Sequence, residues 1–247
     1  VENGRPLLDG LSAHSMPVST KSPVAQKYFD QGLRLSYAFN HPEAIRAFET
    51  ASTVDPTCAM CYWGAALALG PNINAPMAPN AVEPAVAAVA NARANAANAT
   101  AREQAYIAAV AERYSAAKDA DRAALDRAYA DQMRALAKQY PDDLDAQTLT
   151  AEAVMDLSPW DYWTKDGEPK ATTGEIVGLL EGVAQGLDAD RVFEAFTGAL
   201  KGAEWTGNPV PGEIRSIAYQ QLAHGADGQV WFRWRTATAG REQYWHG

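Results

Sequence analysis

Two cysteines separated by two residues, Cys58 and Cys61, form the clearest arrangement of reactive side chains in the sequence. Thiolates at this spacing can chelate a soft metal ion or close a disulfide. A structural zinc site has four ligands as a rule, and neither a second pair of cysteines nor a histidine pair follows. His14 would add a soft ligand if the N-terminal residues fold back, which suits copper better than zinc. The plainer interpretation is that both cysteines pack as small hydrophobic residues, so we expect no cofactor and keep a copper-like ion and a disulfide or redox pair as alternatives.

Two loops carry candidate binding residues. Asn72 and Asn74 lie in GPNINAPMAPN, residues 70–80, where their amides would bond the backbone of a partner or simply shape a connection. Trp160, Tyr162 and Trp163 lie in SPWDYWTKDGEPK, residues 158–170. Three aromatic rings in four positions would form a stacking platform for a sugar or a peptide, or would anchor the loop by packing.

Composition limits the partners. The 247 residues carry a net charge of -9, which argues against nucleic acid or an anionic membrane surface. No apolar run reaches the about 18 residues that a membrane span needs. The chain starts at Val1, and removal of a signal peptide on export from a bacterial cytoplasm is one interpretation, a trimmed start the other. The compartment stays open.

Periodicity predicts helices over most of the chain. Residues 1–24 are rich in Gly, Pro and Ser and read as an extended arm. Residues 25–56 then read as two amphipathic helices that turn back on each other. Further helices are expected over residues 59–69, 81–97, 102–114, 121–140, 145–157 and 174–187.

The opening helix pair has the spacing of a known repeat. Bulky and small residues alternate so that the partner helix can approach, at Tyr28, Gly32, Leu35, Ala44, Phe48, Ala51 and Pro56. This pattern resembles a complete tetratricopeptide repeat. The segments CAMCYWGAALALGPNINAPM, REQAYIAA and AEAVMDLSPWDYWTKDGEPK extend the resemblance over residues 5–188, to bacterial tetratricopeptide-repeat proteins of poorly defined role. The resemblance implies an all-α solenoid of helical hairpins over residues 25–190.

The C-terminal residues have a different character. Residues 211–247 open with Pro211-Gly212, continue with HGAD at 224–227 and end in an aromatic strand, VWFRWR, at 230–235. They resemble the late barrel region of glycoside hydrolase family 42 β-galactosidases. A complete barrel needs eight strands and about 250 residues, so we expect residues 191–247 to be a short non-repeat appendage.

The same resemblance implies a pair of catalytic carboxylates. Retaining glycosidases place two of them about 5–5.5 Å apart. Glu204 is the weak candidate for the nucleophile, with a solvated loop carboxylate as the plainer interpretation, and the strand of the acid/base Glu has no counterpart.

Taken together, the sequence leads to a first hypothesis of a non-catalytic scaffold that holds a peptide or protein partner in its groove. The alternative hypothesis is a carbohydrate-active protein of the β-galactosidase type. If the chain is an enzyme, we expect a glycoside hydrolase of this kind. A soft-metal binder is the third.

Overall fold

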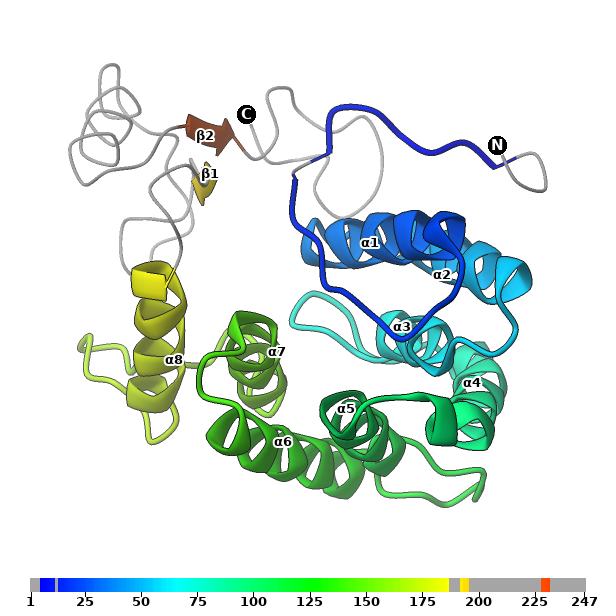
Figure 1. Ribbon diagram of the computed structural model, residues 1–247. Coiled ribbons are helices and arrows are strands. Elements are labelled where there is room, and N and C mark those ends of the chain that lie inside the picture. Colours follow the sequence, from blue (N-terminus) through cyan, green and yellow to red (C-terminus); the bar gives the residue numbers. More distant parts are fainter. Residues whose placement is uncertain (1–4, 12, 187–191, 196–227, 232–247) are drawn as a thin grey trace, which may run out of the picture. The chain divides into compact units, whose positions relative to one another are not determined.

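The computed structural model describes residues 5–11, 13–186, 192–195 and 228–231, and eight α-helices lie among them (Figure 1). The α-helices and strands are α1 (Pro23–Tyr37), α2 (His41–Val54), α3 (Ala59–Leu69), α4 (Val82–Asn95), α5 (Ala101–Glu112), α6 (Arg122–Gln139), α7 (Leu144–Met155), α8 (Thr173–Gly186), β1 (Val192–Ala195) and β2 (Gly228–Trp231). Short 3-10 turns flank α4 at Pro79–Ala81 and Ala96–Asn98. The all-α class is confirmed, whereas the solenoid stays a prediction.

Helix ends follow local sequence. Ser22 caps α1 by accepting a hydrogen bond from the Ala25 amide, with Pro23 in the first turn, where its missing N–H is not needed. Thr100 and Glu103 form a reciprocal capping box at the start of α5. Asp121 and Asp143 cap α6 and α7 in the same way as Ser22. Local polar residues therefore specify the starts of α1, α5, α6 and α7, whereas α2 and α4 have no side-chain cap.

Phe48 on α2 lies at the centre of the first three helices. Its ring is fully buried and meets Phe29 of α1 edge-on, with the ring centroids 5.5 Å apart. A Cβ on Gly32 would lie 2.8 Å from the Phe48 ring, and one on Gly64 would lie 2.3 Å from it. Only glycine lets α1 and α3 approach this ring so closely, which agrees with the small-residue position expected at Gly32.

The chain divides into two compact units. The first comprises residues 1–162 and 175–180, and the second comprises residues 163–174 and 181–247. In the first unit, consecutive helices from α1 to α4 and from α5 to α7 pack against one another. In the second unit, β1 and β2 pair in parallel, with Val192 opposite Gly228. The expected domain boundaries at residues 24 and 190 stay predictions.

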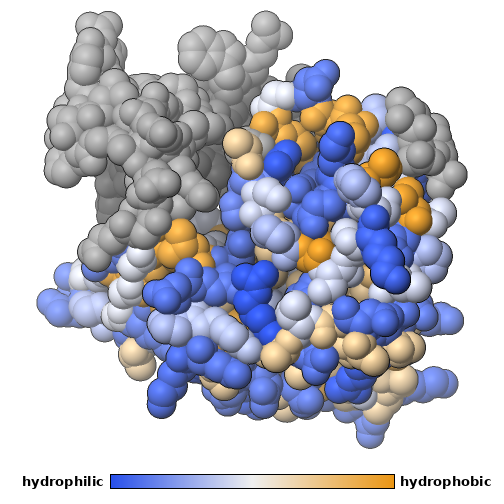
Figure 2. Space-filling model, viewed as in Figure 1, coloured by the Kyte–Doolittle hydropathy of each residue, from blue (hydrophilic) through white to orange (hydrophobic). Residues whose placement is uncertain are grey.

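The surface of the described residues is mixed. On the face shown in Figure 2, hydrophilic residues predominate and hydrophobic ones are interspersed among them. The exposed large hydrophobic residues are Leu7, Leu8, Val24, Trp160, Trp163, Val177 and Leu180. Across the described part of the chain, no helix has the length and apolar character needed to cross a bilayer.

Candidate functional site

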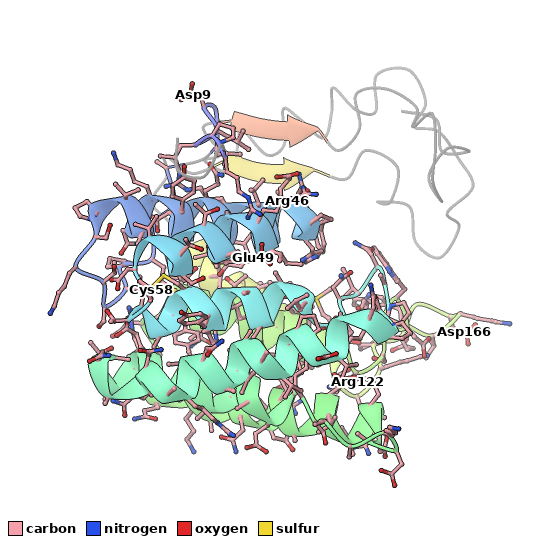
Figure 3. The ribbon with its side chains drawn as sticks, turned by 90° about the vertical axis from the view of Figure 1, so that its right-hand side faces the viewer. Asp9, Arg46, Glu49, Cys58, Arg122 and Asp166 are labelled. Atoms are coloured by element: carbon pink, nitrogen blue, oxygen red, sulfur yellow. A yellow bond between two sulfur atoms is a disulfide. The ribbon has the colours of Figure 1, made fainter. Side chains whose placement is uncertain are left out.

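Cys58 and Cys61 are joined in a disulfide at the beginning of α3 (Figure 3). Both residues are fully buried, and Cys58 is the residue that caps the helix. The structure thus combines two of the alternatives, a disulfide and packing in the core. In this oxidised form neither sulfur is a thiolate, so the soft-metal site is absent from the described structure and stays a prediction for the reduced chain.

His14 does not join the cysteines. Its Nε2 lies 2.8 Å from Oδ1 of Asp145 on α7, and the same oxygen accepts a hydrogen bond of 2.7 Å from the Tyr37 hydroxyl. Among the residues that the structure describes, no group of three or more His, Cys, Asp or Glu side chains is arranged to hold a metal ion. His14 is therefore engaged in fixing the N-terminal arm.

Asn72 and Asn74 form a local turn. Asn72 pairs through its backbone with Ala75, and its side-chain oxygen accepts a hydrogen bond of 2.9 Å from the Asn74 amide. The Asn72 side chain therefore shapes its own loop, as asparagine commonly does. The Asn72 side-chain oxygen, which would accept a hydrogen bond from a partner, already accepts one within the loop.

The three aromatic residues differ in role. The Tyr162 hydroxyl donates to the Met155 carbonyl at 3.2 Å, and burial raises the pKa of this phenol. Trp160 is 49% exposed and has a φ of 62°, a left-handed conformation that bulky residues rarely adopt. Trp163, in the second unit, is 52% exposed. Tyr162 anchors the loop, whereas Trp160 and Trp163 are each about half exposed.

A buried ionic cluster around Arg113 was missed by the sequence analysis. Arg113 follows α5 and is 2% exposed. Its Nη2 donates to Oδ2 of Asp156 at 2.6 Å and to the Pro71 carbonyl at 2.9 Å. Its guanidinium lies 4.5 Å from the ring centroid of Tyr129. The arginine thereby links α6 and the end of α7 to the loop after α3.

A small hollow borders this cluster. Its lining residues are Ser36, Tyr37, His41, Leu67, Ala68, Pro71, Arg113, Leu149 and Glu152. Its enclosed part has space for about one water molecule. Both ring nitrogens of His41 are buried without a hydrogen-bond partner among the described residues. A sugar ring does not fit in this space.

Titration in the cluster follows from burial. Burial raises the pKa of Asp156 to about 7, although Arg113 opposes the shift. Burial also raises the pKa of the neighbouring Glu152 carboxyl, again against Arg113. The pKa of His41 is lowered by burial and then by the Arg113 charge. The cluster can therefore store a proton near neutral pH, but the hollow excludes a glycoside from these carboxyls.

One sequence signal pointed to this cluster. Glu152 and Asp156 are four residues apart in an otherwise largely apolar helix, AEAVMD, so they share one helix face. Two acidic residues on one buried face require a cation, and Arg113, 43 positions before Asp156, supplies it. That partner is set by packing and not by local spacing.

Glu204 and most of the β-galactosidase-like segment lie outside the described residues. Within residues 211–247 the structure describes the backbone of β2 alone, which overlaps the start of the strand expected at 230–235.

Comparison with known proteins identifies a family for the larger part of the chain. A family model described as beta-galactosidase, glycoside hydrolase family 42, matches residues 97–247. These residues include α5 to α8 and the C-terminal segment.

Two curated relatives have the same description. Beta-galactosidase BgaH of Haloferax lucentense is 31% identical in an alignment of 118 residues that covers 42% of this chain and 18% of that protein. Beta-galactosidase BgaA of Clostridium cellulovorans is 46% identical over 39 residues, 16% of this chain and 6% of that protein. The chain thus spans less than a fifth of the length of either relative. No solved structure matches.

These findings correct the first hypothesis. The glycoside hydrolase part of the resemblance is confirmed, and the comparisons give no support to the tetratricopeptide part. The expectation of a non-catalytic scaffold for a peptide or protein partner is wrong, and the carbohydrate-active alternative is favoured. The physical reason is that alternating bulky and small residues report how two helices pack, which is common to many functions.

Proposed function

The chain belongs to the glycoside hydrolase family 42 beta-galactosidases, and from this premise we propose that it is a carbohydrate-active protein that acts on β-galactosides. The observation that carries the proposal is the family match over residues 97–247, more than half of the chain. The relatives' printed names supply the substrate class. Because this chain spans less than a fifth of the length of either relative, the activity of the relatives is proposed for it.

The proposed chemistry needs a carboxylate nucleophile. Retaining glycosidases form a covalent glycosyl–enzyme intermediate on one carboxylate while a second protonates the leaving group. We assign the nucleophile to Glu204, which precedes Pro211-Gly212 in the β-galactosidase-like segment. Glu152 and Asp156 are unsuitable because their hollow has no room for a sugar ring.

Trp160 is proposed as a sugar contact of the first unit considered by itself, and this assignment is independent of Glu204 in the second unit. Its ring is about half exposed, and its strained backbone is held by a loop that Tyr162 anchors to α7. Strained conformations of this kind concentrate at functional sites. The flat apolar face of an indole suits the apolar face of a galactose ring.

The test is hydrolysis of two aryl β-galactosides that differ in leaving group. A dinitrophenyl galactoside needs little acid assistance and reports the nucleophile, whereas a nitrophenyl galactoside depends on a general acid, for which this sequence has no counterpart. We expect Glu204→Gln to lower kcat for both substrates by about 10³-fold or more. Glu213→Gln, in the same segment, is the matched control and is expected to retain activity.

Two results would contradict parts of this proposal. Equal rates for wild type and Glu204→Gln would remove the assigned nucleophile. Absence of hydrolysis in the wild type, together with a galactose-dependent rise in Tm that Trp160→Ala abolishes, would replace hydrolysis by sugar binding. Absence of both activities would reject the carbohydrate-active function for this chain.

A further inference from the structure

Among the N-terminal residues that the structure describes, 5–11 and 13–22, none lies in a helix, yet several of them are bonded to the helices that follow. Arg5 Nη1 donates to the Arg46 carbonyl at 2.7 Å and lies 3.2 Å from Oε2 of Glu49, both on α2 (Figure 3). The Tyr28 hydroxyl on α1 donates to the Arg5 carbonyl at 2.7 Å. Figure 1 shows the arm as a dark blue trace that follows the first helices before it enters α1.

Within this arm, residues 14–21 form a segment that we name the strap. Side chains of α1 form hydrogen bonds with its backbone. The Met16 amide donates to Oδ1 of Asp30 at 3.2 Å, and Gln26 Nε2 donates to the Met16 carbonyl at 3.0 Å. Gln26 Oε1 also accepts from the Val18 amide at 3.0 Å. The Met16 side chain is 1% exposed and belongs to the main core. Side chains rather than a neighbouring strand thus satisfy the strap's backbone.

Two further carboxylates hold the C-terminal half of the strap. Glu103 of α5 accepts from both the amide and the hydroxyl of Ser19, each at 2.5 Å. Asp55, between α2 and α3, accepts from the Thr20 hydroxyl at 2.5 Å and from the Lys21 amide at 3.3 Å. Each contact is directional and involves a charged acceptor, which makes it stronger than a neutral hydrogen bond.

The N-terminal half of the strap reaches α7. His14 pairs with Asp145 at 2.8 Å, and Arg34 Nε of α1 donates to the His14 carbonyl at 2.5 Å. Ser15 donates its hydroxyl to Oδ2 of Asp30 at 2.8 Å. The strap therefore runs across α1, α5, α7 and the turn before α3, all within the first unit.

We propose that the strap is a releasable internal ligand, so that the groove formed by α1, α5, α7 and the turn before α3 recognises residues 14–21 as an extended peptide. The strap lies outside every helix, so it can detach without breaking a helical hydrogen bond. The groove recognises amide and hydroxyl donors through Asp30, Asp55 and Glu103, and it recognises one apolar side chain through the pocket of Met16. While the strap is bound, this groove is closed. The inference rests on the first unit alone and is independent of the galactoside activity.

Hydrogen exchange on the full wild-type chain provides the first test. The amides of Met16, Val18, Ser19 and Lys21 donate to side chains, so we expect them to exchange at least about tenfold more slowly than in an unfolded peptide. We also expect them to open at lower denaturant concentration than the amides of α1 and α5. Exchange at the unfolded rate would overturn the proposal. Opening only together with the helices would overturn it as well.

Binding of the strap as a separate peptide provides the second test. A labelled peptide of residues 13–21 is titrated with the full chain carrying Met16→Asp, in which the internal strap has lost its anchor. We expect this chain to bind the peptide at least about tenfold more tightly than the wild type does, because the wild-type groove is occupied. Full-length Ala13→Asp is the matched control, since Ala13 is exposed just before the strap, and it is expected to behave as the wild type.

The remaining outcomes also decide the matter. A peptide that itself carries Met16→Asp is expected not to bind. A folded Met16→Asp chain that fails to bind the wild-type peptide would overturn the proposal. A Met16→Asp chain that loses its helices would overturn it too, because the strap would then be an integral part of the core.

Discussion

The carboxylates at the strap and the carboxylates at the ionic cluster show opposite pKa shifts within one unit. Burial alone would raise the pKa of Glu103 and Asp55, but hydrogen bonds from Ser19 and Thr100, and from Thr20 and Thr57, outweigh it and lower both values. Burial prevails at Glu152 and Asp156, whose pKa values are raised although Arg113 is near. At the strap, N–H and O–H donors outweigh a smaller cost of burial, whereas at the cluster the cost of burial is larger and Arg113 does not outweigh it.

Helix position adds to the difference between Glu103 and Asp156, although Asp55 keeps a lowered pKa as the C-cap of α2. Glu103 lies in the first turn of α5, where the positive end of the helix dipole favours a carboxylate. Asp156 is the C-cap of α7, at the negative end of the dipole, where a carboxylate is disfavoured. The predictions that follow test this contrast, beginning with the largest expected effect.

Glu103→Gln should be the most damaging change. It replaces a charged acceptor of two 2.5 Å hydrogen bonds from Ser19 by a neutral amide that also carries donors. We expect a loss of about 3 kcal/mol in the free energy of unfolding at pH 7, measured by urea titration. Glu112→Gln, exposed at the end of the same helix, should change it by less than about 0.5 kcal/mol. Equal effects of the two variants would show that the hydrogen bonds from Ser19 to the Glu103 carboxylate do not stabilise the folded chain.

Reduction of the Cys58–Cys61 disulfide should have the next largest effect. The disulfide begins α3, directly after the Asp55 turn that holds the strap. Loop-closure entropy for so short a loop gives a loss of about 2 kcal/mol on reduction. The measurement is Tm with and without a phosphine reductant, and the Cys58→Ala/Cys61→Ala variant should be insensitive to the reductant. A reduced wild type as stable as the oxidised one would refute this.

Glu152→Gln should stabilise the chain at alkaline pH. Because its folded-state pKa is raised, wild-type Glu152 contributes stability below its unfolded pKa, and this is lost as the pH rises through the folded value. The neutral amide removes that loss. We expect Tm to rise by about 2–4 °C at pH 8, or about 1 kcal/mol for a chain of this size. No change is expected at pH 5. A lower Tm at pH 8 would show that the charge is needed to pair with Arg113.

Asp55→Asn should have an effect of about the same size as Glu152→Gln, but in the opposite pH range and of the opposite sign. The folded-state pKa of Asp55 is lowered, so its contribution is present above the unfolded pKa of about 3.9 and is lost as the pH falls through the folded value. The variant should be less stable than the wild type at pH 6 by about 1 kcal/mol, and the gap should narrow as the pH falls below about 3.9. A constant gap across this range, measured by urea midpoint, would contradict the assignment.

Much of the helical architecture could be predicted from residues close in sequence. The spacing of Tyr28, Gly32 and Phe48 indicated two packed helices, and Gly32 indeed lies against the Phe48 ring. The loop residues Asn72 and Asn74 were identified as a pair, but the turn that they form with Ala75 uses the Asn72 side chain locally. The scaffold function was wrong because the same spacing occurs in helix pairs of many functions.

The amino-acid sequence by itself determined most of the helices and the family likeness of the C-terminal residues, since these depend on periodicity and on the motifs of residues 211–247. Only the tertiary structure decided which distant groups meet: the strap with Asp30, Asp55 and Glu103, and Arg113 with Asp156. The physical reason is that a hydrogen bond or ion pair depends on distances of about 3 Å between atoms. Residues dozens of positions apart reach that distance only when packing of the apolar helix faces brings them together.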